Sequence, residues 1–126
     1  MTVQPGTGTP VVDTALLAAA AAASLEDWGP LAEATGAPMQ TYGVTLWSFG
    51  DDDEGPSAGV WDCTAGPSYW VQEQHEFVHI LSGTLTVTPD GGTPASLGPG
   101  DCAVFPRGWR GTWELHETVR KVYVLF

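Results

Sequence analysis

The sequence predicts a single all-β domain, a barrel or jelly roll, preceded by an Ala-rich helix. Short segments rich in β-branched and aromatic residues alternate polar and apolar positions, which is the periodicity of half-buried strands. Clusters of Gly, Pro and Asp interrupt these segments about every 8–12 residues, as in antiparallel β-proteins. The 126 residues are enough for one core and too few for two.

The first 38 residues are expected to form an arm and a helix, and residues 39–126 the barrel. Residues 1–10 are rich in Gly, Thr and Pro, which is typical of a flexible arm or an extended edge segment. Asp13 is a suitable N-cap, and residues 14–25 are dominated by alanine, which has the highest helix propensity. Residues 26–30 are expected to end this helix, and residues 31–35 to add one further turn.

The strand pattern begins at residue 40 and continues to the C-terminus. Expected strands include residues 40–49, 59–64, 76–83, 84–88 and 119–126, in a total of about eight to ten. In the last strand, Val122, Val124 and Phe126 are expected to form the apolar face. The acidic run at residues 51–54 lacks the alternating spacing of a calcium loop, so a solvated loop is expected.

The charge distribution excludes several kinds of partner. The chain has 15 acidic and four basic side chains and a formal net charge of −11. All four bases lie in the last 20 residues: Arg107, Arg110, Arg120 and Lys121. Such an acidic chain repels phosphate backbones and anionic lipids, so neither a nucleic acid nor a membrane is an expected partner.

Cysteine spacing and hydropathy give no sign of secretion. Cys63 and Cys102 have neither the number nor the spacing of a disulfide framework or a zinc site. The apolar run at residues 14–24 follows no Lys or Arg and is too short to span a bilayer. A cytoplasmic location is therefore expected.

Two motifs resemble the signatures of the cupin family, whose members fold as small β-barrels. Glu76 and Gly83 match the first motif, Glu-x6-Gly, and Gly100, Pro106 and Gly108 match the second, Gly-x5-Pro-x-Gly. The resemblance implies a single cupin barrel with a jelly-roll-like course.

A closer resemblance is to the small proteins related to the (S)-ureidoglycine aminohydrolase cupin domain. It covers a little over half the chain and is carried by residues 59–64, Trp70, residues 76–83, Pro106, Gly108, Gly111, Trp113, Arg120, Lys121 and Tyr123. This resemblance implies a homodimer, which exposed edge strands and an N-terminal arm also favour. The aminohydrolase relatives use a metal.

The histidines with which cupins hold a metal are missing from the matching positions. The His-x-His slots of the first motif hold Tyr69 and Val71 or, at the other spacing, Trp70 and Gln72. The histidine slot of the second motif is Gly111, which has no side chain. Neither pair binds a transition metal as two imidazoles would, so no metal and no other cofactor is expected. If a metal does bind, Glu76 is the retained ligand, helped by Gln72 or Cys102.

Glu76 is the strongest candidate for chemistry. Alternate residues of a barrel strand point into the lumen, so Gln72, Gln74, Val78 and Ile80 share its orientation, whereas His75 and His79 face away. A carboxylate in an aromatic lumen can transfer protons near neutral pH. Alternatively, Glu76 pairs with Arg110 or Lys121, and the sequence leaves the two interpretations open.

Other polar and aromatic residues complete the candidate site. Lys121 and Tyr123 share one face of the last strand and are candidates for proton transfer or for holding an anion. The large aromatic residues are core or mouth residues that suit a planar or cyclic ligand. The expected catalytic residues are Glu76, Lys121 and Tyr123, and the expected substrate-binding residues are Trp47, Trp61, Trp70, Gln72, Arg110 and Trp113.

Three functions are compatible with these residues. The first is a metal-independent enzyme of the isomerase, cyclase or lyase type, in which Glu76 is the general acid or base. The second is a non-catalytic module that binds a small ligand. The third, implied by the resemblance, is a metal-dependent hydrolase like the ureidoglycine enzyme, and the missing ligands count against it.

Overall fold

The computed structural model describes residues 24–50 and 55–126, which form ten strands and no helix. Six strands belong to the first sheet: β1 (Glu26–Pro30), β2 (Gln40–Ser48), β3 (Ser57–Cys63), β5 (Glu76–Ser82), β8 (Cys102–Phe105) and β10 (Val119–Leu125). Four belong to the second: β4 (Gly66–Val71), β6 (Leu85–Pro89), β7 (Ala95–Leu97) and β9 (Arg110–Leu115). In this part of the chain, no helix is long and apolar enough to cross a membrane.

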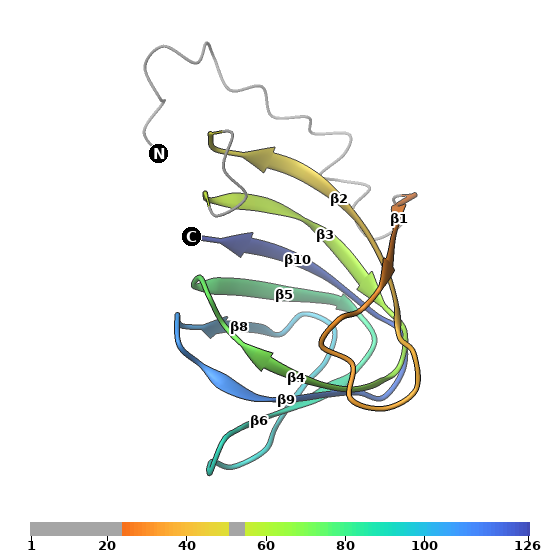
Figure 1. Cartoon of the computed structure of the whole chain (residues 1–126), viewed down its shortest axis with the longest axis vertical. Coiled ribbons are helices and arrows are strands. Elements are labelled where there is room, and N and C mark those ends of the chain that lie inside the picture. Colours follow the sequence, from red (N-terminus) through yellow and green to blue (C-terminus); the bar gives the residue numbers. More distant parts are fainter. Residues whose placement is uncertain (1–23, 51–54) are drawn as a thin grey trace.

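The two sheets are antiparallel and lie across from each other, with the core between them (Figure 1). The first has the order β1-β2-β3-β10-β5-β8 and the second the order β4-β9-β6-β7. No ladder joins the two sheets among the described strands. The all-β prediction is therefore confirmed, but the fold is an open two-sheet arrangement and not a closed barrel.

Alternating burial explains why these segments form strands. In β5 and β9, every second side chain is buried, and the residues between them are more exposed. One face of each strand therefore packs into the core, and the other meets solvent or a neighbouring segment. The central core residues from the two sheets are Ile80, Val78, Trp113, Leu115 and Val119, each at most 2% exposed.

Gly83 explains the spacing of the first motif. It follows the end of β5 with a φ of +83°, in the left-handed region that favours glycine. A Cβ at this position would also lie 2.2 Å from the carbonyl oxygen of Thr118. Strand β5 thus begins at Glu76 and ends at Ser82, directly before the position where only glycine fits.

Residues 26–30, which were expected to terminate the N-terminal helix, form strand β1 and pair with β2. Pro30 is tolerated because β1 is an edge strand, where a residue without an N–H group need not interrupt the hydrogen bonds between strands. Most of the predicted helix, at residues 14–23, lies outside the described residues.

The predicted apolar face of the last strand is also wrong. Val119, Lys121 and Tyr123 are buried, whereas Phe126 is 53% exposed. Hydropathy alone predicts that the face with Val122 and Val124 is the buried one. The structure buries the polar face instead, because Lys121 finds a carboxylate partner inside.

Candidate small-molecule site

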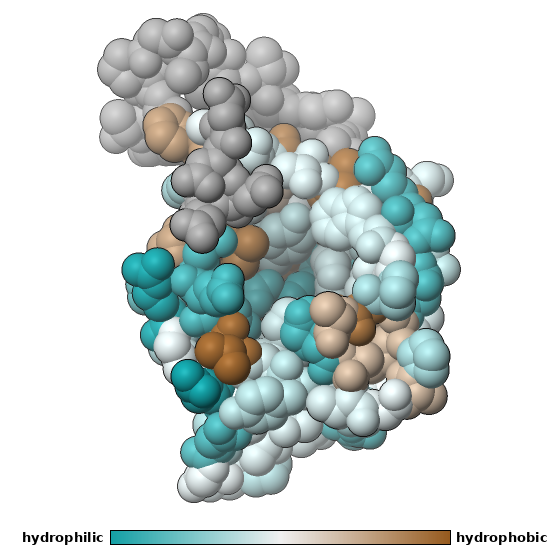
Figure 2. Space-filling view, viewed as in Figure 1, coloured by the Kyte–Doolittle hydropathy of each residue, from teal (hydrophilic) through white to brown (hydrophobic). Residues whose placement is uncertain are grey.

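A cavity of about 430 Å³ lies between the two sheets. Figure 2 shows a hollow on the face drawn, walled largely by residues of neutral or hydrophilic character. The aromatic lining consists of Trp28, Trp61, Trp70 and Tyr123, and the polar lining includes Glu33, Gln72, Glu73, Gln74, Glu76 and Lys121. Strands from both sheets contribute, so the fold itself builds the cavity.

Cross-strand pairing brings the lining residues together on the first sheet. Lys121 of β10 pairs with Trp61 of β3 on one side and with Ile80 of β5 on the other. Trp61 pairs in turn with Gly43 of β2. The Trp28 ring lies over Gly43, where a Cβ would approach the ring to 2.3 Å. One cross-strand row therefore places Lys121 beside Trp61, and the Trp28 ring lies over Gly43, the next residue of that row.

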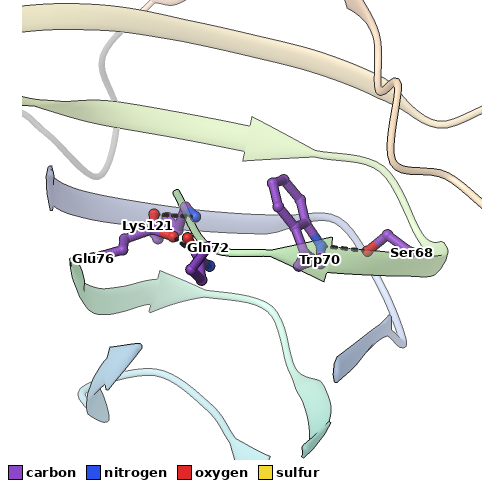
Figure 3. A network of polar contacts seen from close by, with 5 residues as sticks. All are labelled: Ser68, Trp70, Gln72, Glu76 and Lys121. Carbon is purple, nitrogen blue, oxygen red and sulfur yellow. Dashed lines mark hydrogen bonds and ion pairs between the residues drawn. The ribbon is translucent and has the colours of Figure 1, made fainter. Parts of the chain in front are cut away.

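Lys121 and Glu76 form a buried ion pair at this site (Figure 3). The Lys121 Nζ donates to Glu76 Oε2 at 2.8 Å, and the two side chains are 5% and 7% exposed. Gln72 Nε2 donates to the other carboxylate oxygen at 3.3 Å. Of the two partners that the sequence left open, Lys121 and not Arg110 holds the carboxylate.

The Lys121 ammonium also contacts two indole rings. Its Nζ lies 4.3 Å from the centroid of Trp61 and 4.5 Å from that of Trp113. Both distances are typical of cation–π contacts, which gain strength away from water. The carboxylate and the two rings therefore hold the buried ammonium from several sides.

Tyr123 is the third predicted catalytic residue, and it lines the cavity on the same face of β10 as Lys121. Burial raises the pKa of its phenol, a hydrogen bond with the Thr45 side chain lowers it, and the Glu76 charge raises it, with a net upward shift. The phenol is therefore protonated at neutral pH and offers a hydrogen-bond donor or a proton.

The Trp70 ring is fixed by polar and aromatic contacts. Its Nε1 donates to Ser68 Oγ at 2.8 Å, and this hydroxyl donates to the backbone oxygen of Trp113 at 3.2 Å. The ring lies 5.0 Å from Trp113 and meets Trp61 edge-on at 6.5 Å. Contacts within the protein thus fix this wall, as in a largely preformed pocket.

Three of the predicted binding residues do not line the cavity. Trp113 is 1% exposed and belongs to the core beneath Lys121. Arg110 begins β9 and is exposed on the outer side, beside Tyr69. Trp47 is 43% exposed and stacks on Phe49 with ring centroids 6.2 Å apart.

A β-bulge explains why Trp47 lies outside the cavity. Thr45 pairs with Gly59 and Trp47 with Ala58, so Leu46 is an additional residue on β2. One extra residue moves every later side chain to the opposite face of the strand. Trp47 therefore points outward, although uninterrupted alternation would have placed it inside.

The alternation around Glu76 was predicted correctly. Gln72, Glu76, Val78 and Ile80 are buried, and Gln74 lines the cavity. His75 and His79 are not among the lining residues. The Nδ1 atom of His75 instead accepts a hydrogen bond from the backbone N–H of Arg107 at 2.9 Å.

The sequence analysis missed several residues that line the cavity, chiefly Trp28, Glu33 and Glu73. Trp28 was interpreted as part of a helix end, because it precedes Gly29 and Pro30. Gly43 was the available signal: a glycine within an otherwise regular strand often marks the close approach of another group. Glu33 and Glu73 lie outside the strands and have no sequence signal.

The residues present do not fit the metal that the cupin resemblance implies. At Gly111, a Cβ would lie 2.3 Å from the Thr88 carbonyl oxygen and 2.6 Å from the Trp109 ring, so no ligand side chain fits there. The Lys121 ammonium already occupies one oxygen of Glu76. Within residues 24–50 and 55–126, no three His, Cys, Asp or Glu side chains form a cluster that could hold an ion.

The fold and the cavity define a small cupin-like domain with a ligand-sized space between its sheets. The chain belongs to the EutQ-like cupin domain family, whose profile matches residues 50–123. This match confirms the cupin resemblance of the two motifs. No curated protein matches the chain.

Solved structures support the same fold. A Pseudomonas syringae pv. tomato protein of unknown function, from the DUF861 family, is 20% identical with a TM-score of 0.75, over 84% of this chain and 46% of its own. The chain therefore spans less than half of that protein. The Clostridium difficile EutQ protein is 17% identical with a TM-score of 0.67, over 82% of this chain and 80% of its own. A Thermotoga maritima DUF861 protein is 34% identical with a TM-score of 0.52, over 53% of this chain and 76% of its own.

Proposed function

We propose that this EutQ-like cupin binds a small organic molecule in the cavity between its sheets. The observation that carries the proposal is the combination of size and lining. A volume of about 430 Å³ lies in the usual range of ligand pockets, roughly 300–1,000 Å³. Indole faces provide the apolar contact area, and a few buried polar groups provide orientation.

We further propose that Glu76 transfers protons to and from the bound molecule without a metal. In an isomerisation, its carboxylate would accept a proton from one atom of the ligand and return it to a neighbouring atom, so that no oxidant or reductant is needed. Lys121 would hold the carboxylate in place, and the Tyr123 phenol would donate a hydrogen bond to a ligand oxygen. The buried position of Glu76 at the cavity wall favours this second role.

A ligand screen of the full chain tests binding. Small cyclic and nitrogen-containing metabolites are scored by the rise in melting temperature, because a ligand that binds only the native state stabilises it. We expect Trp70→Ala to abolish the stabilisation by a true ligand, since Trp70 lines the cavity. Trp47 is an exposed tryptophan outside the cavity, so Trp47→Ala is the matched control and should leave the stabilisation by the ligand unchanged.

Recovery of the ligand after incubation separates an enzyme from a binding module. Mass spectrometry and NMR detect a converted ligand in the first case and an unchanged one in the second. If turnover is found, Glu76→Gln should reduce kcat by about 100-fold or more, the usual contribution of a general base. Asp62→Asn, which breaks the separate ion pair between β3 and β10, is the control. Unchanged turnover in Glu76→Gln contradicts the catalytic role.

Homodimer formation and the closer resemblance to the ureidoglycine aminohydrolase group stay predictions of the sequence. Sedimentation of the full chain at several concentrations tests the first, and ureidoglycine in the ligand screen tests the second.

A further inference from the structure

We infer that the cavity selects an organic cation, a molecule with a protonated amine attached to a ring or a hydrophobic skeleton. The inference rests on the proposed small-molecule site and adds the charge of its occupant. It differs from the expectation that Lys121 and Tyr123 hold an anion.

The lining of the cavity carries a negative net charge. Three carboxylates line it, those of Glu33, Glu73 and Glu76, and Lys121 is the one basic side chain of the lining. Three negative charges and one positive charge leave −2, in a chain whose formal charge is −11. A cleft lined by charges of one sign concentrates ligands of the opposite sign.

Lys121 is not available to hold an anion. Its Nζ donates to Glu76 at 2.8 Å and lies 4.3 and 4.5 Å from two indole centroids. The ammonium thus has one carboxylate and two indole rings as close neighbours, which leave little of its charge for an anionic ligand. An anionic ligand would have to displace the Glu76 carboxylate, which would then remain buried without its partner.

At the base of the cavity, the Glu76 carboxylate can still accept hydrogen bonds. Glu76 receives one hydrogen bond on each oxygen, from Lys121 and from Gln72, whereas a carboxylate has about four lone-pair sites. A protonated amine supplies the donors that match this surplus. Its positive charge also reduces the repulsion between Glu76 and the two outer carboxylates.

The aromatic walls suit the same ligand. Trp61 already holds one ammonium, that of Lys121, over its ring, and Trp28 and Trp70 extend the indole surface of the cavity. Ring faces carry partial negative charge and attract cations, and tryptophan does so most strongly. The carboxylates and the indole rings thus both attract a positive charge, and a neutral or anionic ligand would gain nothing from this attraction.

Three probes on one skeleton test the inference: phenethylammonium, 2-phenylethanol and phenylacetate. Each is titrated calorimetrically into the full chain at pH 7 and low ionic strength. We expect phenethylammonium to bind at least tenfold more tightly than 2-phenylethanol, and phenylacetate to bind more weakly than either. Tightest binding of phenylacetate or of 2-phenylethanol overturns the charge preference and leaves the proposed small-molecule site standing.

Paired variants separate the cavity from the overall charge. Glu33→Gln/Glu73→Gln removes two lining charges and should reduce the preference for the amine over the alcohol several-fold. Glu114→Gln/Glu117→Gln removes two charges outside the lining and should leave the preference unchanged. Equal losses in the two double variants overturn the inference, because the overall charge would then explain the binding. Absence of binding by all three probes also overturns it, whereas the proposed function is decided by the ligand screen.

Discussion

Lys121 and Glu76 are a charged pair in a place where neither charge would be stable alone. Their side chains are 5% and 7% exposed, and the atoms that bond are 2.8 Å apart. Removing one partner of a buried pair leaves the other charge desolvated, whereas removing both is often tolerated. The stability of the site therefore depends on the two residues together.

We expect Lys121→Met to lower the free energy of unfolding by about 3–5 kcal/mol, because it leaves the Glu76 carboxylate without its counter-charge. Urea denaturation measures the change. Lys121→Met/Glu76→Gln should recover part of this loss. Asp62→Asn breaks a more exposed pair, whose side chains are 15% and 16% exposed, and should cost about 1 kcal/mol. A loss in Asp62→Asn as large as that in Lys121→Met would contradict the importance of burial.

Cys63 gives the protein a pH dependence in the alkaline range. Burial raises the pKa of its thiol from 9.0 to about 11, an effect that Lys121 opposes and Asp62 supports. The unfolded chain therefore releases this proton at lower pH than the native protein. The contribution to stability is complete below pH 9, falls between pH 9 and 11, and is lost above that range.

We expect the free energy of unfolding to fall by about 3 kcal/mol through this range because of Cys63 alone. Cys63→Ala should flatten the decline, although it lowers stability at neutral pH by leaving a small cavity. Cys102 is exposed, and Cys102→Ala is the matched control. An equally steep decline in Cys63→Ala and the native chain would assign the effect to other groups, such as the Tyr123 phenol.

At the scale of the strands, β1 and β2 together hold one wall of the cavity. The Trp28 ring covers Gly43, and a Cβ at this position would lie only 2.3 Å from a ring carbon. We expect Gly43→Ala to displace this ring, to lower stability by about 1–3 kcal/mol and to increase amide exchange in β1. Gly98→Ala is the control, because its Cβ would meet nothing closer than 3.7 Å.

A second variant checks the cause of this effect. Gly43→Ala/Trp28→Ala removes the ring that the new methyl group would meet, so alanine at position 43 should be less harmful in that background. Additive losses of the two substitutions would argue against a contact between them, since residues in contact deviate from additivity.

The strands that the sequence predicted well are those with uninterrupted alternation. From Glu76 to Ile80 every second residue is inside, so parity alone identified Glu76 and its neighbours as buried. In β2 the same alternation would not have placed Trp47 correctly, because the bulge at Leu46 has no distinctive sequence. Strand β1 was missed because its five residues end in Gly-Pro, which also ends helices.

Buried polar residues limit prediction in another way. Hydropathy assigned the interior face of β10 to its valines, whereas Lys121 and Tyr123 occupy it. Their burial depends on Glu76 and Trp61, which are distant in sequence and meet β10 only through strand pairing. The candidate residues could be named from the sequence, but their pairing is a property of the fold.

At the scale of the whole molecule, acidic charge acts on stability and on binding in opposite directions. The chain has 15 acidic and four basic side chains, and only two ion pairs occur within residues 24–50 and 55–126. Repulsion among the remaining carboxylates destabilises the compact state. The same charge attracts a cationic ligand to the cavity.

Added salt should therefore stabilise the protein and weaken amine binding. Raising NaCl from about 0.01 to 0.1 M shortens the screening length from about 30 to 10 Å, which reduces repulsion between exposed carboxylates. We expect the free energy of unfolding to rise by on the order of 1 kcal/mol, and the affinity for phenethylammonium to fall over the same range. Sucrose at matched osmolality is the control, because it leaves charges unscreened. A fall in stability with salt would mean that favourable ion pairs outweigh the repulsion, and salt-independent binding of the amine would mean that its charge is not recognised.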